Sequence, residues 1–243
     1  MYLRKFISFF LFMSLLALSW AFLAADDHIT EESTRTYMDR TTPPMTSEIW
    51  IRENKTCYLG RSFNFIYRYD LKKRYTINLR NKKYLEEPLE KSSKPAEKEK
   101  IRIQTLGFDY SPAFDWMVTK TDKEKIIDGH TCKLYILEGD ADYAEEKREL
   151  WVAQDVQIDL DRYYEFMVKP GLDEQWLKVY EKNPELKHSI VLESQTITEN
   201  PIAPTMTWKS KVTKIESVEP PEGLYELPEG FQKVETREEL YAR

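Results

Sequence analysis

Histidine, cysteine and carboxylate side chains are the residues that could act on a substrate or bind a metal. The chain has 243 residues but only three histidines and two cysteines, and it contains neither the Gly-x-Ser-x-Gly nor the His-Glu-x-x-His pattern of known hydrolases. Asp128, His130 and Cys132 alternate, and could in principle bind a metal from one face of a strand. Because no fourth ligand is evident, a structural role is the better interpretation. We therefore expect a protein that is not an enzyme, without catalytic residues or a cofactor.

The first 25 residues have the layout of a secretory signal peptide, which predicts a periplasmic or secreted protein. Arg4 and Lys5 form a positive start, residues 6–23 are almost wholly apolar, and small residues follow up to Ala25. The apolar run is also close to the minimum length of a membrane-spanning helix. An uncleaved N-terminal anchor is therefore the alternative, and it would be the one segment in contact with a membrane.

Cleavage after Ala25 would create a possible metal site at the new N-terminus. The chain would then begin Asp26-Asp27-His28, and its amine, two backbone amides and the imidazole could surround a metal in a plane. Four nitrogens in a square suit Cu(II) or Ni(II). Cleavage after Ala21 is the alternative, and it would leave His28 too far from the amine. Asp26, Asp27 and His28 are thus a metal-site hypothesis that depends on the cleavage site.

Cys57 and Cys132 both fall in predicted strands. In an oxidising compartment two thiols on one chain often pair, and a disulfide that closes so long a loop would stabilise the fold by roughly 2–4 kcal/mol. The alternative is that both are small, buried, apolar residues. The sequence favours neither interpretation.

Period-2 alternation of apolar residues predicts antiparallel strands along most of the chain. In residues 125–156, two alternating arms flank a polar turn at residues 139–142, as expected for a half-buried hairpin. A hairpin is not stable alone, so further strands must complete the sheet. We expect these strands at residues 47–52, 56–59, 63–69, 75–79, 84–85, 117–119, 189–197 and 205–218.

From residue 158 the apolar spacing changes to i, i+3, i+4 and i+7, which predicts two short helices. Asp159 or Asp161 can cap the first, which ends at Pro170-Gly171, and Asp173 can cap the second, which ends at Asn183-Pro184. Helices inserted among antiparallel strands must pack on one face of the sheet. Their apolar side chains either close the core or line an apolar ligand pocket. The pocket candidates are Tyr163, Tyr164, Phe166, Met167, Trp176, Leu177 and Tyr180.

Composition divides the chain behind the signal peptide into three segments. Residues 26–46 are rich in Asp, Glu, Thr and Arg, which predicts a flexible acidic lead-in. Residues 47–235 form the β domain, interrupted by a charged loop at residues 90–100, and residues 236–243 are a C-terminal tail. The net charge of −6 and the absence of a basic stripe count against nucleic acid as a partner.

Three short motifs resemble a known superfamily. They are KIIDGHTCKLY at residues 125–135, ELWVAQDV at residues 149–156 and LYELPEGFQKV at residues 224–234, and they are similar to motifs of secreted bacterial domains of unknown function related to the periplasmic lipoprotein carriers (the LolA/LolB-like superfamily). The resemblance implies an α+β, mainly β fold: a curved antiparallel sheet, or half-open barrel, whose concave face is covered by short helices. In those carriers the cavity holds lipoprotein acyl chains. The matched motifs are turns and strand positions, so no ligand residue is carried over.

Two functions are consistent with this sequence. The first is a non-enzymatic periplasmic binding or carrier-like protein for a lipidic or lipoprotein ligand, whose partner is an acyl chain or a lipoprotein. The alternative is an envelope interaction module, such as a stress sensor or assembly factor, whose partner is another envelope protein and which has no small-molecule ligand. An apolar cavity beneath the helices favours the first function, and a filled core with an exposed apolar patch favours the second.

Overall fold

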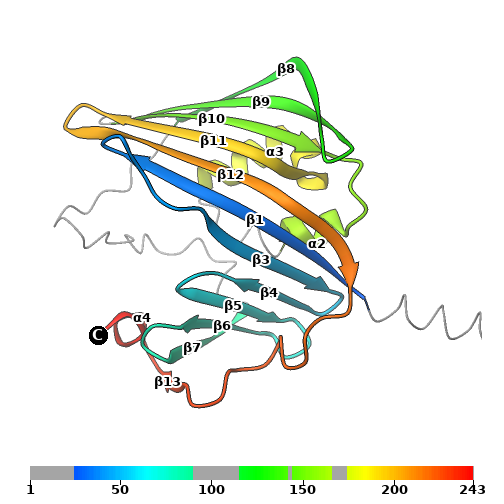
Figure 1. Ribbon diagram of the computed structural model, residues 1–243, viewed down its shortest axis with the longest axis vertical. Helices are drawn as coiled ribbons and strands as arrows, with labels where there is room; N and C mark the ends of the chain where they lie inside the picture. Colours follow the sequence, from blue (N-terminus) through cyan, green and yellow to red (C-terminus); the bar gives the residue numbers. More distant parts are fainter. Residues whose placement is uncertain (1–24, 90–114, 142–143, 166–173, 243) are drawn as a thin grey trace, which may run out of the picture.

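A computed structural model describes residues 25–89, 115–141, 144–165 and 174–242, and Figure 1 shows its fold. These residues form a single 13-stranded sheet with a few short helices. The strands are β1 (Asp26–Tyr37), β2 (Arg40–Thr41), β3 (Met45–Arg52), β4 (Lys55–Leu59), β5 (Phe63–Arg68), β6 (Lys73–Asn78), β7 (Lys83–Pro88), β8 (Asp115–Ile127), β9 (His130–Ala141), β10 (Ala144–Ala153), β11 (Ile190–Asn200), β12 (Ala203–Val218) and β13 (Gln232–Val234). The helices are α2 (Leu160–Tyr163), α3 (Glu174–Lys182), the 3-10 helix η4 (Pro184–His188) and α4 (Arg237–Tyr241).

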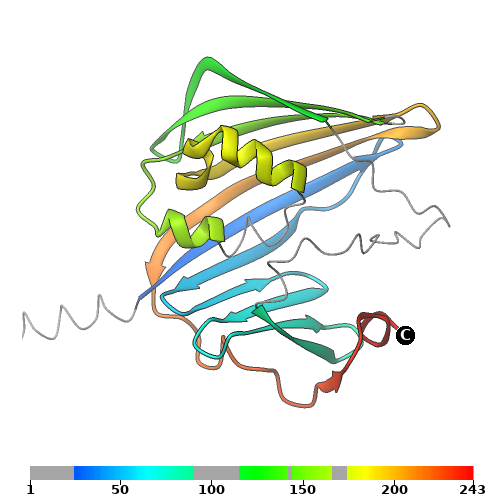
Figure 2. The same cartoon turned by 180° about the vertical axis from the view of Figure 1, so that it is seen from behind.

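The sheet is curved and almost entirely antiparallel. Its strands lie in the order β13-β7-β6-β5-β4-β3-β1-β12-β11-β10-β9-β8, with β2 paired to β1, and only β13 and β7 run parallel. As far as the chain is described, the sheet is open, with β13 and β8 at its edges. Helices α2 and α3 lie behind the sheet in Figure 1 and in front of it in Figure 2. The predicted fold class, a curved and mainly β sheet with short helices on one face, is confirmed.

We call the face that carries α2 and α3 the helix side, and the opposite one the outer face. Consecutive residues of a strand point to opposite faces, and β3 shows the division clearly. Ile49 and Ile51 belong to a buried cluster that also contacts Leu160 and Tyr163 of α2. Trp50, between them, belongs to a second cluster.

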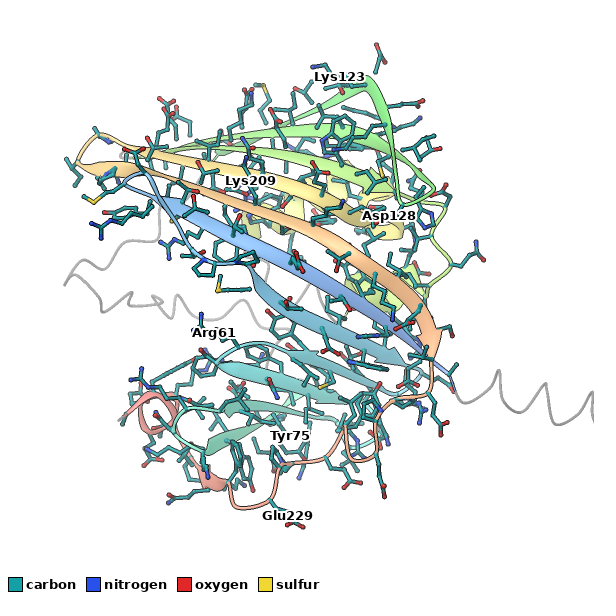
Figure 3. The ribbon with its side chains drawn as sticks, in the orientation of Figure 1. Arg61, Tyr75, Lys123, Asp128, Lys209 and Glu229 are labelled. Atoms are coloured by element: carbon teal, nitrogen blue, oxygen red, sulfur yellow. The ribbon has the colours of Figure 1, made fainter. Side chains whose placement is uncertain are left out.

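The second cluster lies on the outer face, and we call it the outer-face core. The connection between β12 and β13 closes it, since Leu224, Leu227 and Phe231 pack against its buried members. Figure 3 is drawn from the outer side and labels Tyr75, which is one of them. The buried members are Trp50, Cys57, Ile66, Tyr75, Ile77 and Tyr225.

The prediction that residues 26–46 form a flexible lead-in is wrong. Asp26–Tyr37 forms β1, which pairs with both β12 and β3 near the middle of the sheet. Ile29 and the terminal Tyr37 are its only large apolar residues, and Ile29 is fully buried. The polar side chains are accommodated because partners on other strands bind them, as Arg52 binds the buried Asp26. The polar composition of residues 26–37 therefore did not reveal that they form a strand near the middle of the sheet.

The hairpin predicted at residues 125–156 is correct in its pairing and wrong at its start. β9 and β10 pair antiparallel along their whole length. A second hairpin, between β8 and β9, turns at Asp128 and Gly129 inside the first predicted arm. Their φ angles of 48° and 86° are left-handed, the conformation that an Asp-Gly pair adopts readily in a two-residue turn. The other predicted strands are all present with ends shifted by a few residues, except that the strand predicted at residues 117–119 extends to Ile127 as β8.

The helix ends agree with the predicted signals where they are described. Asp159 accepts a hydrogen bond from the backbone N–H of Arg162 and caps α2, and α3 ends just before Asn183-Pro184. Pro170-Gly171 and Asp173 lie outside the described residues. The C-terminal tail carries α4, which is capped by Thr236 and buries Leu240 against Leu85 and Val234.

Two of the predicted segments cannot be placed in the fold. Residues 1–24, which hold nearly all of the expected signal peptide, and residues 90–114, which include the charged loop, lie outside the described residues. Within the described part, no helix combines the length and apolar character needed to cross a membrane.

Candidate functional site

Strands β4 and β5 carry a row of aromatic side chains on the helix side. Tyr58 lies opposite Phe65 and next to Ile49 in the strand register, so it shares their face. Along β5 the aromatic residues recur at every second position, which keeps them on one side. All are half-buried. We call this set the aromatic row, and its members are Tyr58, Phe63, Phe65, Tyr67 and Tyr69.

Helices border both ends of the aromatic row. Tyr69 packs against the same buried cluster as Leu160 and Tyr163 of α2. At the other end, the ring of Phe63 meets Tyr241 of α4 edge-on, with 5.4 Å between centroids. Rings within the row also touch, with centroids 5.8 Å apart for Tyr58 and Phe65. The row therefore lies between two helices, and ring contacts within it join Tyr58 to Phe65 and Tyr67 to Tyr69.

A second aromatic group fixes α3 to the sheet. The ring of Trp176 lies 4.7 Å from Trp116 of β8 and 6.5 Å from Tyr180, centroid to centroid. The guanidinium of Arg148 stands 4.4 Å from the centroid of Trp176 and 5.1 Å from that of Trp116, a cation–π arrangement. Tyr164, which directly follows α2, belongs to the same group, since its ring centroid lies 5.1 Å from that of Tyr180.

The space beneath α3 is nearly filled. The described residues enclose a cavity of about 30 Å³ there, enough for one or two waters and far below the ~300 Å³ at which ligand pockets begin. Of the predicted pocket residues, Tyr163, Trp176 and Tyr180 line it. Five lining residues were not predicted, because their spacing in the sequence indicates burial but not a cavity. They lie in strands or at η4 and are Leu137, Leu150, Leu186, Ser189 and Val191.

The remaining pocket candidates are placed differently. Tyr164 is buried and contacts Tyr180, but it does not line the cavity. Leu177 is half-buried and is likewise absent from the cavity wall. Phe166 and Met167 lie outside the described residues. The structure thus brings Tyr163, Tyr164, Trp176 and Tyr180 together, and the aromatic row of the sheet is the feature that the sequence analysis did not single out.

Burial raises the pKa of several polar groups on the helix side. Burial raises the pKa of Tyr163, Tyr67 and Tyr69, and raises that of Tyr180 to about 12. Burial also raises the pKa of Glu31, although a hydrogen bond with Ser210 acts in the opposite direction. Tyrosine hydroxyls that stay protonated can hydrogen-bond to a ligand without adding charge. This side of the sheet therefore suits an apolar or weakly polar ligand.

Two of the proposed N-terminal metal residues, Asp26 and His28, form a structural network on the outer face, whereas Asp27 lies on the helix side and accepts a hydrogen bond from the backbone N–H of Asp159. His28 stacks on Trp50, with centroids 3.9 Å apart, and its ring nitrogens lie 3.0 Å from Glu48 and 3.1 Å from Glu216. Asp26 is fully buried, 2.5 Å from Arg52, and accepts a hydrogen bond from the Tyr225 hydroxyl.

This arrangement contradicts the metal-site hypothesis. Asp26, Asp27 and His28 lie in an extended strand that pairs on both sides. A planar four-nitrogen site needs the chain to wrap around the metal, which a strand in the middle of a sheet does not do. His28 is also held between two carboxylates on other strands.

The other metal and thiol hypotheses are also corrected. Cys57 and Cys132 are free and buried, and five strands separate β4 from β9 in the sheet order, so the disulfide interpretation is wrong. Desolvation raises the pKa of Cys57 to about 12. His130 contacts Asp155, at 3.2 Å, while Cys132 lies in the core. Among the described residues no group of three or more His, Cys, Asp or Glu is placed to hold a metal.

Comparison with known proteins gives similarity at the level of structures only. No protein-family profile matches the sequence, and no curated protein is significantly similar to it. A LolA superfamily protein from Nitrosomonas europaea is 9% identical, with a TM-score of 0.30, over 83% of this chain and 90% of that one. A DUF1329 family protein from Desulfovibrio piger is 11% identical, with a TM-score of 0.31, over 87% of this chain and 93% of that one.

The structure of PNGF-II is a further neighbour, 11% identical with a TM-score of 0.40; it matches 88% of this chain, which spans only 31% of that protein's length. The neighbours thus include the superfamily that the sequence motifs resemble. TM-scores of this size carry no argument about activity, so a function must be inferred from the residues of this chain.

Proposed function

We propose that this protein is a non-enzymatic, carrier-like binding protein of the periplasm or secreted space, and that it holds an acyl chain of a lipid or lipoprotein on its helix side. The observation that supports this most strongly is the aromatic row, which presents five rings on one face of two strands. The opposite face of the same strands is closed by the outer-face core. On the helix side the five rings stay half-buried, which leaves apolar area that a ligand can cover.

The ligand is proposed to lie along the aromatic row and not in the cavity beneath α3. From Phe63 to Tyr69 the row extends about 20 Å at the rise of a β-strand. One acyl chain spans half of the ~30 Å hydrocarbon core of a bilayer, which is about 15 Å. The length of the row therefore matches a single extended chain, whereas the cavity of about 30 Å³ does not.

The expected localisation supports the proposal. Residues 1–25 have the order of a signal peptide, and an acyl chain that crosses an aqueous compartment outside the cytoplasm needs an apolar cover. Each CH₂ group exposed to water costs about 0.8 kcal/mol. The proposed covering surface is the helix side.

Binding of a fluorescent fatty-acid analogue tests the proposal directly. Phe65→Asp places a charge in the aromatic row and should weaken binding about tenfold or more, because a carboxylate would be desolvated against the acyl chain. Thr34→Asp is the matched control: it adds the same charge to the outer face, beside Lys209, and should leave binding unchanged. Equal effects of both variants, or no binding by the unaltered protein, would refute the proposal.

The filled packing beneath α3 favours a second candidate function, an envelope interaction module without a small-molecule ligand. Native mass spectrometry of protein purified from its own cells distinguishes the two. Retained acyl material supports the carrier, whereas a bare chain that co-purifies with one envelope protein supports the module.

A further inference from the structure

Half of the large apolar side chains that the described residues expose are gathered at one end of the sheet. Ile202 is 84% exposed, Met38 60%, Tyr37 39% and Trp208 37%. The other four are scattered: Leu71, Met117, Ile126 and Tyr241. Single exposed apolar residues are ordinary, but a cluster marks a contact surface.

Strand pairing brings the four residues together. Met38 belongs to the turn between β1 and β2, and Ile202 to the turn between β11 and β12. β1 pairs with β12, so that Tyr37 lies opposite Met206 and Arg35 opposite Trp208. Figure 1 shows the two turns side by side at the left-hand end of the sheet. We call Tyr37, Met38, Ile202, Met206 and Trp208 the apolar tip.

The apolar tip projects from the sheet and is continuous with the helix side. Ser210 of β12 contacts Glu31 and the hydroxyl of Ser194 on β11. The neighbour of Ser194 in β10 is Leu150, which lines the cavity. Met206 and Trp208 precede Ser210 at every second position of β12, so their side chains point to the same face, the helix side.

The chemistry of the apolar tip fits the interfacial region of a lipid bilayer. Tyrosine and tryptophan are enriched at the level of the headgroups, with aliphatic side chains deeper. The exposed Arg35 and Arg40 flank the tip on β1 and β2, and a guanidinium binds phosphate well.

We propose that the apolar tip inserts into the headgroup region of a lipid bilayer and brings the helix side against the membrane. This inference rests on the proposed function, because it assigns the place at which an acyl chain passes between the bilayer and the aromatic row. A chain that crosses there avoids water, whose contact costs about 0.8 kcal/mol per CH₂.

A bilayer fits this end better than a second copy of the chain. A two-fold self-association surface sets the same patch of both copies against each other, so Arg35 and Arg40 would approach the arginines of the second copy. A bilayer deforms around a projection, and its phosphates complement the two arginines.

Flotation with vesicles of phosphatidylethanolamine and phosphatidylglycerol tests the inference on the protein as purified from its own cells. The double variant Met38→Ser/Ile202→Ser should lower the fraction bound about tenfold. The reason is that it removes several CH₂ groups that the bilayer would bury on binding. The matched control is Leu71→Ser/Ile126→Ser, which removes two exposed apolar side chains elsewhere and should not change binding. Circular dichroism checks that both variants fold.

The possible outcomes separate the inference from the proposed function. Fatty-acid binding in the absence of vesicles reports on the aromatic row alone, and the tip variant should retain it. No vesicle binding by the unaltered protein, or an equal loss in the control variant, overturns the inference. A dimer in gel filtration that Ile202→Ser abolishes also overturns it, because the tip would then be a self-interface.

Discussion

Apolar residues alternate along β4 and β5, but the two faces of these strands differ in how deeply their side chains are buried. On the outer face, Cys57 and Ile66 are buried at 0% and 2% exposure, closed over by the connection from β12 to β13. On the helix side, their neighbours Tyr58 and Phe65 remain half-buried. Strand periodicity alone therefore does not say which apolar face is the core. The connection between β12 and β13, which lies far along the chain, covers the outer face and makes it the core.

This difference indicates that the outer face stabilises the fold and that the helix side is the better candidate for a functional surface. The outer-face core carries tightly partnered polar groups at its rim, such as Asp26 with Arg52 and Tyr225, as expected of a structural core. The helix side carries half-buried rings and a carboxyl, Glu31, whose pKa burial raises. Unsealed apolar surface and a desolvated acid both cost stability, and such costs are typical of functional surfaces.

The largest expected effect comes from breaking the rim of the outer-face core. Asp26→Ala removes a fully buried carboxylate and leaves the Tyr225 hydroxyl without its acceptor. Since Arg52 still reaches water, we expect the free energy of unfolding to fall by about 3 kcal/mol, measured by urea denaturation.

The neighbouring variant Asp27→Ala is the control for that measurement. Asp27 accepts one hydrogen bond from the backbone N–H of Asp159 in a solvent-exposed setting, so its removal should cost about 1 kcal/mol or less. Equal losses in the two variants would contradict the structural role assigned to Asp26.

Truncations on the two faces should next separate stability from binding. Ile77→Ala leaves a cavity in the outer-face core, where Ile77 is 0% exposed, and should lower the free energy of unfolding by about 2–4 kcal/mol without changing ligand affinity. Phe65→Ala should cost about 1 kcal/mol of stability and weaken binding of the fatty-acid analogue about tenfold. The comparison fails if Ile77→Ala weakens binding as much as Phe65→Ala does.

The smallest effect is a pair of pH dependences with opposite signs. Burial raises the pKa of Glu31 on the helix side, so its contribution is fully favourable below the ordinary glutamate range near pH 4.3 and is lost as the pH rises through its folded value. Lys214 and then His28 lower the pKa of Glu216 on the outer face. Its contribution is present above pH 4.3 and is lost as the pH falls through its folded value.

Glutamine variants of Glu31 and Glu216 test the two predicted pH dependences of stability. At pH 7, Glu31→Gln should raise the unfolding midpoint and Glu216→Gln should lower it, and both differences should vanish in acid. Thermal unfolding between pH 2 and pH 8 checks this, and shifts of the same sign in the two variants would contradict it.

The individual strands and helices were predictable because their signals are local, whereas the curved sheet with helices on one face was implied by the resemblance of three motifs to a known superfamily. Alternation located most strands, the change of spacing at residue 158 located the helices, and Asp159 and Asn183-Pro184 marked helix ends that the structure confirms. β1 was missed because it buries polar residues such as Asp26 and His28, whose partners Arg52 and Glu216 are distant in sequence. No local pattern records such a partner.

The candidate site was only partly predictable for the same reason. The apolar stripe of the helices drew attention to Tyr163, Trp176 and Tyr180, which line one small cavity, while their role in binding a ligand stays a prediction. The aromatic row was visible as an alternation, but its significance depends on which face the connection from β12 to β13 covers. The apolar tip required the register between β1 and β12, which joins residues about 170 positions apart.

The position of β1 limits how early the sheet can form during synthesis. Its first residue, Asp26, pairs with Val218 of β12, so the middle of the sheet cannot close until most of the chain has left the ribosome. At 5–20 residues per second, that interval lasts roughly 10–40 s. A chain with an export signal, as residues 1–25 predict, must stay threadable until translocation begins. Because β12 is made late, β1 has no neighbour on one side until the last long strand is synthesised, which keeps the middle of the sheet open during that interval.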